Sequence, residues 1–188
     1  MLSDYNFDPH DQTALTHITR HVAGSGVSGS SFFADVFPDA ESVVRYVLQL
    51  LHDNPEAFHD YAGEPQAREF DAGRPIGYDA LVQLATLPES ASVRDETRGS
   101  HDNYTVSVVS GIEKPTTPKL VVVIGPPRDA DKHVFYTIHP GKNAPPFPLS
   151  EEALRKSGLT GEPLQKAIAD NVGNEQFWSQ HGFVDDGS

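Results

Sequence analysis

The sequence has no cysteine and no long apolar run, and each absence excludes a class of protein. Without cysteine, the chain can form no disulfide, no thiolate metal site and no cysteine nucleophile. No stretch approaches the roughly 18 consecutive apolar residues of a membrane-spanning helix. The first residues, Met1–Asp4, lack the basic and apolar layout of a cleaved signal peptide. We therefore expect a soluble protein that is cytoplasmic, or that is secreted or delivered to a target cell without a cleaved signal peptide.

Four motifs of common enzymes are also missing. The sequence contains no phosphate loop of the GxxxxGK[ST] type, no GxGxxG after an expected strand, no HExxH and no GxSxG. The segment Gly24–Ser31 is rich in glycine, but it follows an expected helix rather than a strand, which argues against a nucleotide cradle. No cofactor is expected.

Basic residues are scarce relative to acidic ones. The chain has 14 lysines and arginines against 27 aspartates and glutamates, which gives a formal net charge of −13. Such a charge argues against broad, non-specific binding of polyanions, although it leaves room for a local basic cleft. With 188 residues, we expect one domain with an ordered core at about residues 11–182 and flexible ends.

The pattern predicts two helices in the first third of the chain. Asp11 is expected to cap the first, and Asp39 the second. His17 and His21 are four residues apart and would share one face of the first helix. Residues 55–75 are expected to be irregular, and Ile76–Leu87 is ambiguous between helix and strand. The apolar positions with helical spacing are Ala14, Leu15, Ile18 and Val22 in the first helix, and Val43, Val44, Val47, Leu48 and Leu51 in the second.

The second half of the chain predicts strands. Residues 88–103 are expected to be an exposed loop, whereas strand patterns occupy residues 104–110, 119–124 and 133–139. Their short connections favour an antiparallel meander. Short helices are expected at 151–156 and 162–171, with Phe177 and Trp178 packing onto the core near the C-terminus. N-terminal helices packed on an antiparallel sheet, followed by short C-terminal helices, make an α+β fold.

The last of these expected strands, residues 133–139, carries side chains that could take part in catalysis. Side chains alternate along a strand, so one set would share one face and the other would form the core face. The first set is His133, Phe135, Thr137 and His139, and the second is Val134, Tyr136 and Ile138. Pro140-Gly141 ends the strand. A hydroxyl and an imidazole would thus lie side by side.

A metal site is the weaker of two interpretations of the histidines. His17 and His21 have the spacing of a two-histidine metal ligand, and His139 would serve as a third. This spacing is common, so no metal is expected. Equally open is that His17 and His21 simply occupy the solvated face of an amphipathic helix.

Two segments resemble a family of bacterial toxins. The first is Leu15–Val22 followed by a loop, Ser30-Ser31-Phe32 and an amphipathic helix; the second is Thr137-Ile138-His139-Pro140. Together they resemble the RNase A-like toxin domain at the C-termini of contact-dependent growth-inhibition effectors and, more loosely, the barnase/EndoU/RelE-like superfamily. The resemblance covers about residues 14–51 and 104–141. The chain departs from the family pattern where it lacks an arginine after His21, and where His139 replaces a tyrosine.

The resemblance implies a ribonuclease that needs no metal and cuts RNA by attack of its 2′-OH, leaving a 2′,3′-cyclic phosphate. His21 and His139 would be base and acid, in either order, because histidine titrates near neutral pH. Thr137 would donate to a phosphate oxygen, and His17 would orient His21 or the substrate. The cation that binds phosphate would come from a basic residue elsewhere, and a cognate immunity protein would be a partner. The candidate cations are Arg20, Arg94, Arg98 and Lys142.

An alternative from another functional class is a protein-binding module without catalysis. The charge of −13 is natural for a domain that masks a basic partner, as an immunity protein or antitoxin does. The charged residues around His21 distinguish the ribonuclease from the protein-binding module. Converging arginine and lysine favour the enzyme, whereas carboxylates favour the binding module.

Overall fold

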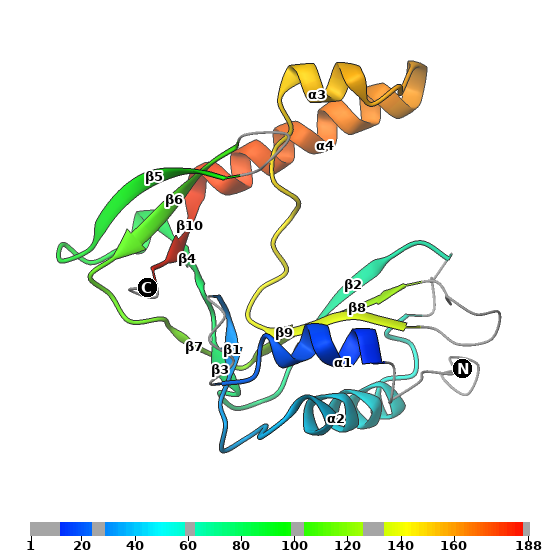
Figure 1. Ribbon diagram of the computed structural model, residues 1–188, viewed down its shortest axis with the longest axis vertical. Coiled ribbons are helices and arrows are strands. Elements are labelled where there is room, and N and C mark those ends of the chain that lie inside the picture. The colour runs from blue at the N-terminus through cyan, green and yellow to red at the C-terminus, as the bar shows by residue number, and fades with distance from the viewer. Residues whose placement is uncertain (1–11, 24–28, 59–62, 99–103, 126–133, 186–188) are drawn as a thin grey trace. The chain divides into compact units, whose positions relative to one another are not determined.

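The computed structural model describes residues 12–23, 29–58, 63–98, 104–125 and 134–185 (Figure 1). The chain divides into two compact units. The first unit comprises residues 1–80 and 115–143, and the second comprises residues 81–114 and 144–188. The expectation that the chain forms a single domain remains a prediction, because two compact units can belong to one domain or to two. No helix within the described ranges is long and apolar enough to cross a membrane.

The first unit combines two helices with two small sheets. Its helices lie against one face of the sheet of order β2-β8-β9, and the other sheet has the order β1-β3-β7 (Figure 1). All strand pairs in both sheets are antiparallel. The elements are α1 (Gln12–Thr19), β1 (Ser31–Phe32), α2 (Ala40–Asp53), β2 (Gln66–Asp71), β3 (Gly77–Tyr78), β7 (Thr116–Thr117), β8 (Lys119–Gly125) and β9 (Val134–Pro140).

Helix α1 is shorter than its apolar pattern predicts. The backbone closes into turns of three residues after Thr19, where His21 N–H donates to the Ile18 carbonyl at 2.9 Å. Val22 then forms an isolated parallel bridge with Phe32, which draws the chain out of the helix. The prediction that His17 and His21 share a helix face is therefore wrong, because only His17 lies in α1. The expected cap, Asp11, lies outside the described residues.

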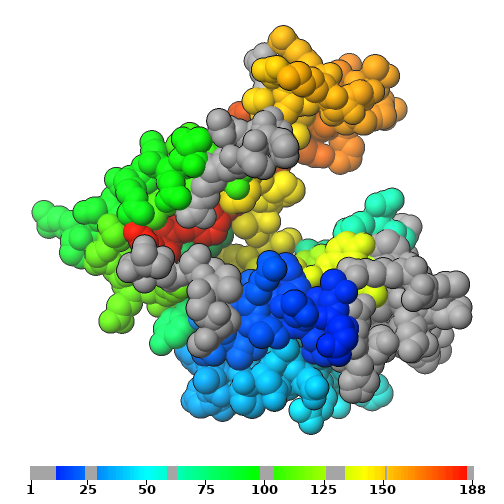
Figure 2. All heavy atoms as spheres, in the orientation of Figure 1, coloured from blue at the N-terminus to red at the C-terminus, as the bar shows by residue number. Residues whose placement is uncertain are grey.

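Helix α2 begins where the sequence predicts. The Asp39 carboxylate accepts from Ser42 N–H at 2.7 Å, and the Ser42 hydroxyl faces the Asp39 N–H in return, which completes a capping box. In Figure 2 the cyan residues of α2 lie directly against the blue residues of α1. Together with apolar residues of β8 and β9, the two helices form a hydrophobic core cluster.

Strand β9 does not alternate simply. Phe135 pairs with Ile124 and Thr137 pairs with Val123, so Tyr136 is an extra residue in a β-bulge. The bulge places Phe135 in the core beside Ile138 and leaves Tyr136 37% exposed. The prediction that Tyr136 faces the core and Phe135 does not is wrong for this reason.

The second unit is built on a four-stranded sheet of order β4-β10-β6-β5. Strand β10 pairs parallel with β6, and the other pairs are antiparallel. Strand β6 therefore joins this sheet, whereas β8 and β9 form a hairpin in the first unit. The elements are β4 (Leu81–Gln83), a 3-10 turn (Leu84–Thr86), β5 (Ser92–Arg98), β6 (Tyr104–Ser110), α3 (Glu151–Lys156), α4 (Gly161–Gln180) and β10 (His181–Val184).

Aromatic rings hold the proline-rich segment Pro145–Pro148 to this sheet. Phe147 stacks on Tyr104 at 4.0 Å and on Trp178 at 4.5 Å between ring centroids. The Trp178 indole N–H also faces the carbonyls of Pro145 and Pro146. The packing expected of Trp178 is thus confirmed, although the residue belongs to α4, which is much longer than predicted.

The α+β class is confirmed, but three of the longer strands were not predicted. β2 and β5 occupy segments expected to be irregular or an exposed loop, and β10 occupies residues for which no strand was predicted. β2 and β5 are edge strands with several charged side chains, a composition that gives little strand signal.

Candidate functional site

The first unit brings together the two histidines expected to act as a pair. The ring centroids of His21, just beyond α1, and His139, near the end of β9, lie 5.4 Å apart with the planes tilted by 40°. The His17 ring lies 5.9 Å from that of His21. The rings of His21 and His139 are thus in contact and do not face each other across a cleft. Their catalytic roles stay predictions.

Both imidazoles use Nδ1 to hold a backbone carbonyl. His21 Nδ1 lies 3.0 Å from the Ser30 carbonyl oxygen, and His139 Nδ1 lies 3.1 Å from that of Pro140. A carbonyl oxygen can only accept, so Nδ1 carries the proton in each ring. In the neutral form, Nε2 of each ring is then the nitrogen with the free lone pair.

Burial favours the neutral form of all three rings. It lowers the pKa of His21 from 6.5 to about 4, opposed by the Ser30 carbonyl and aided by the charges of His139, His17 and Arg20. Burial also lowers the pKa of His17, with a smaller contribution from Arg20.

Opposing effects act on the pKa of His139. Burial lowers it most, and His17 lowers it further, whereas the Pro140 carbonyl and the carboxylates of Asp79 and Glu69 raise it. The carboxylates of Asp79 and Glu69 therefore raise the pKa of His139, whereas the positive charge of Arg20 lowers the pKa of His21.

Asp79, which directly follows β3, was not predicted as a site residue. It is only 6% exposed. Its Oδ2 accepts from Lys142 N–H at 3.2 Å, and its Oδ1 lies 3.5 Å from the Ser30 hydroxyl. Ser30 Oγ also accepts from Ala80 N–H at 3.0 Å. Ser30 thereby connects Asp79, through its hydroxyl, with His21, through its carbonyl.

Gly141 permits this arrangement. Its φ is +104°, a conformation that side chains rarely adopt, and a Cβ there would lie 2.6 Å from Asp79 Cγ. The Pro140-Gly141 pair that ends β9 therefore also lets the backbone approach the Asp79 carboxylate. The sequence shows the strand end but contains no signal that Asp79 lies against it.

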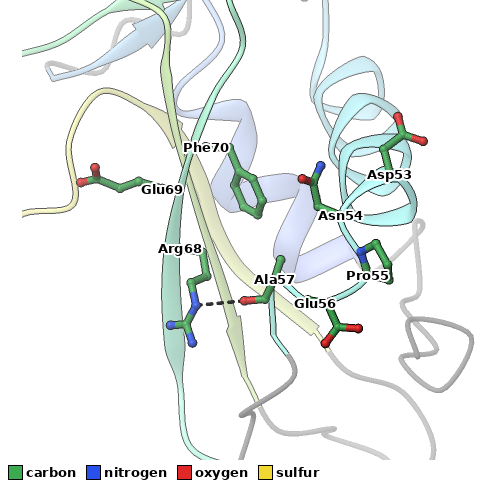
Figure 3. A pocket seen from close by; sticks show the side chains of 8 residues that line it. All are labelled: Asp53, Asn54, Pro55, Glu56, Ala57, Arg68, Glu69 and Phe70. Atoms are coloured by element: carbon green, nitrogen blue, oxygen red, sulfur yellow. Dashed lines mark hydrogen bonds between the residues drawn. The ribbon is translucent and has the colours of Figure 1, made fainter.

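The strand register places Thr137 and His139 on one sheet face, as predicted. Residues that pair directly across two strands lie on the same face of a sheet. Thr137 pairs with Val123, and His139 pairs with Val121. Val121 also pairs with Glu69 of β2, so Glu69 lies on the same face as His139. Glu69 points to the side of β2 opposite Phe70 (Figure 3). Its carboxylate accepts from Asn143 N–H at 2.7 Å.

The four candidate cations are spread over both units. Arg20 acts on His17 and His21, and Lys142 is exposed beside the site, where its N–H binds Asp79. Arg94 belongs to the second unit, where its guanidinium binds Asp185 at 2.7 Å and lies 3.8 Å from Glu96. Arg98 ends β5 in the same unit. The contribution of each to substrate binding stays a prediction.

Within the described ranges, no three histidine, aspartate or glutamate side chains are arranged to hold a metal ion. His17, His21 and His139 therefore do not form the three-ligand site that their spacing left open.

A separate, open pocket of about 510 Å³ lies where α2 meets β2 (Figure 3). Arg68 spans one wall, with Nε donating to the Ala57 carbonyl at 2.9 Å and the guanidinium over the Phe58 ring. None of the lining residues is a histidine, so the pocket does not supply the proton-transfer groups of the histidine pair. The lining residues are Asp53, Asn54, Pro55, Glu56, Ala57, Arg68, Glu69 and Phe70.

The comparisons with known proteins concern the fold. No protein-family model matches the sequence, and no curated protein matches it significantly. The 2.35 Å crystal structure of a conserved hypothetical protein from Toxoplasma gondii ME49 is similar, with a TM-score of 0.50 and 12% sequence identity. The alignment covers 97% of this chain and 94% of that chain. At that identity, the similarity shows a shared fold alone.

Proposed function

We propose that the chain is a ribonuclease of the bacterial-toxin type, which cleaves RNA without a metal at the His21–His139 pair. The observation that carries the proposal is the contact between these two imidazoles, which come from distant parts of the sequence and each have Nε2 free of the backbone bond. Two imidazoles so placed can serve one phosphodiester, because one can take a proton while the other gives one.

The proposed step is an internal transfer of the phosphoryl group. One Nε2 takes the proton of the ribose 2′-OH, and the 2′ oxygen forms a bond to phosphorus. The bond from phosphorus to the 5′ oxygen breaks, and the other imidazole, protonated at the start, gives its proton to that oxygen. The products are a 2′,3′-cyclic phosphate and a 5′-OH end, and exchange with water restores both imidazoles.

The electrostatics of the pair set the expected pH range. Because burial lowers the pKa of both rings, the fraction of the pair that carries one proton grows below neutral pH. We therefore expect faster cleavage at about pH 5 to 6 than at pH 8, since a general acid acts best near its own pKa. The charge of Arg20 acts on His21, and we assign Arg20 the contact with the phosphate.

The test is cleavage of single-stranded RNA by the purified chain in EDTA across about pH 4.5 to 8. Replacing His21 by Asn or His139 by Ala is expected to lower the rate by about two to four orders of magnitude. Thr137→Val should cost less, because it removes one donor and keeps the strand. His52→Asn, on the exposed last turn of α2, is the matched control. Intact RNA with a well-folded wild type, or full activity of both histidine variants, would refute the proposal.

A second function is favoured by the carboxylates. Asp79 and Glu69 both act on His139, and the chain carries a net charge of −13, which suits a module that binds a basic protein. Under this proposal the Glu69 face is the contact surface. Retention of a protein from a bacterial lysate by the wild type, lost with Glu69→Lys and combined with no RNA cleavage, would favour the module. A cognate immunity protein is instead the partner expected of the ribonuclease.

A further inference from the structure

The second unit holds a proline-rich part of its own chain on its surface. Residues 145–149 belong to no helix or strand and lead into α3 (Figure 1). None of these residues is buried, and Leu149 is 43% exposed, whereas Trp178, which contacts them, is only 5% exposed. Because residues 145–149 take part in no strand pair, they can leave the surface without opening the sheet.

The ring of Phe147 is held between two other rings. It stacks on Tyr104 of β6 with the planes 12° apart, and on Trp178 of α4 with the planes 25° apart. One face of a ring accommodates one stacked partner, so Tyr104 and Trp178 lie on opposite faces of Phe147. Phe183 of β10 lies 6.2 Å from Phe147 between ring centroids. We call Tyr104, Trp178, Phe183 and the nearby Asn171 the aromatic clamp.

The aromatic clamp also binds backbone atoms, which any extended proline-rich chain would present. The indole N–H of Trp178 faces the carbonyls of Pro145 and Pro146 at 3.3 and 3.2 Å. The Asn171 amide accepts from Leu149 N–H at 2.6 Å and donates to the Leu149 carbonyl at 3.1 Å. An extended proline-rich chain makes no internal hydrogen bonds, so its carbonyls are available to such donors. Aromatic side chains that hold a chain in this way are the common means of recognising proline-rich peptides.

We propose that the aromatic clamp is a binding site for a proline-rich segment of a partner protein, and that residues 145–149 occupy it as an internal competitor. The partner segment has the pattern Pro-Pro-aromatic-Pro, because the clamp holds one ring and the carbonyls of the two prolines before it. The clamp residues come from α4, β6 and β10, which contact one another, so the site stays in place when the internal segment leaves. The proposal is independent of the ribonuclease function, because every contact lies within the second unit.

The internal segment should weaken binding of any partner to the wild type. A segment tied to its site by short connections competes at an effective concentration of about 1 mM. Phe147→Ala removes the ring that the clamp holds and leaves the backbone of the segment unchanged. We therefore expect this variant to expose the ring position between Tyr104 and Trp178 to a peptide added from solution.

The experiment titrates a peptide with the sequence of residues 144–150, blocked at both ends, into Phe147→Ala and into the wild type. The single tryptophan, Trp178, belongs to the clamp, so its fluorescence reports binding directly. We expect saturable binding to Phe147→Ala that is at least about tenfold tighter than binding to the wild type. Leu159→Ala, at an exposed residue between α3 and α4, is the matched control and should behave as the wild type does.

Two further variants test which contacts recognise the peptide. A peptide with alanine in place of its phenylalanine should bind Phe147→Ala at least about tenfold more weakly, because the ring is the side chain that the clamp holds. Asn171→Ala, combined with Phe147→Ala, should weaken binding of the original peptide about tenfold, since it removes both hydrogen bonds to the residue equivalent to Leu149.

The proposal is overturned if folded Phe147→Ala binds no peptide at about 1 mM, the effective concentration of the internal segment. Equal binding of the peptide that lacks phenylalanine would overturn it as well. If Phe147→Ala does not fold alone, the peptide should restore the near-UV circular dichroism of Trp178, and a failure to do so counts against the site. A wild-type dimer that the free peptide dissociates would show the segment of a second copy in the clamp, and would overturn the choice of a partner protein.

Discussion

Acidification should destabilise the first unit because it forces a proton onto a buried His21. The pKa of this ring is about 4 in the folded chain and 6.5 in an exposed state, so folding favours the neutral form. The contribution to stability is complete above pH 6.5 and is lost as the pH falls toward 4. From this difference, His21 alone should cost about 2 kcal/mol of unfolding free energy at pH 5 relative to pH 7.5.

The measurement compares the wild type with His21→Asn, whose amide N–H can donate to the Ser30 carbonyl in place of Nδ1. Urea unfolding of both proteins is followed from pH 7.5 to pH 5. The difference in unfolding free energy between them should shrink by about 2 kcal/mol over this range. Other titrating groups are present in both proteins and cancel to first order.

The probe must report on the first unit. The single tryptophan, Trp178, lies in the second unit, so its fluorescence is unsuitable. Amide signals from β8, whose apolar residues line the core, report directly. His52→Asn controls for the loss of an imidazole as such. If the difference in unfolding free energy between the wild type and His21→Asn is the same at pH 7.5 and pH 5, the burial of a neutral His21 is refuted.

Three further predictions concern other parts of the chain. Gly141→Ala should destabilise the first unit by about 2 to 4 kcal/mol, because its φ is +104° and the new Cβ would meet Asp79; chemical denaturation measures this. Trp178→Ala should cost the second unit about 3 to 5 kcal/mol, since it removes the ring stacked on Phe147; loss of the Tyr and Phe near-UV signals at lower urea checks it. RNA cleavage should speed up between about 20 and 150 mM salt, because salt screens the net charge of −13 from the polyanion, and a steep slowing would contradict this.

The sequence predicts best where local signals agree with the final packing. Asp39 and the apolar stripe of α2 define that helix completely, and the strands β6, β8 and β9 lie where aromatic and β-branched residues gather. The histidine pair could be predicted because the segments that carry His21 and His139 are the two that resemble the toxin family. Their contact is a property of the fold that the pattern alone does not contain.

The remaining features depend on partners far along the chain. Asp79 has no local signal, since its burial depends on Gly141 and Lys142 more than 60 residues later. The bulge at Tyr136 depends on the register with β8. The chain passes from one unit to the other after Ala80, Lys114 and Asn143, and the sequence pattern does not show that the segments between these positions pack in different units.

The central claim is that the 2′-OH of RNA attacks its own phosphate at the His21–His139 pair. Its most direct test is chain-end analysis of a short RNA incubated with the folded chain in EDTA at about pH 5.5, beside the same oligonucleotide with one 2′-deoxyribose. We predict 2′,3′-cyclic phosphate and 5′-OH ends at the ribonucleotides, and no cut after the deoxyribose. Cleavage after the deoxyribose, 5′-phosphate ends, or RNA left intact would contradict the claim.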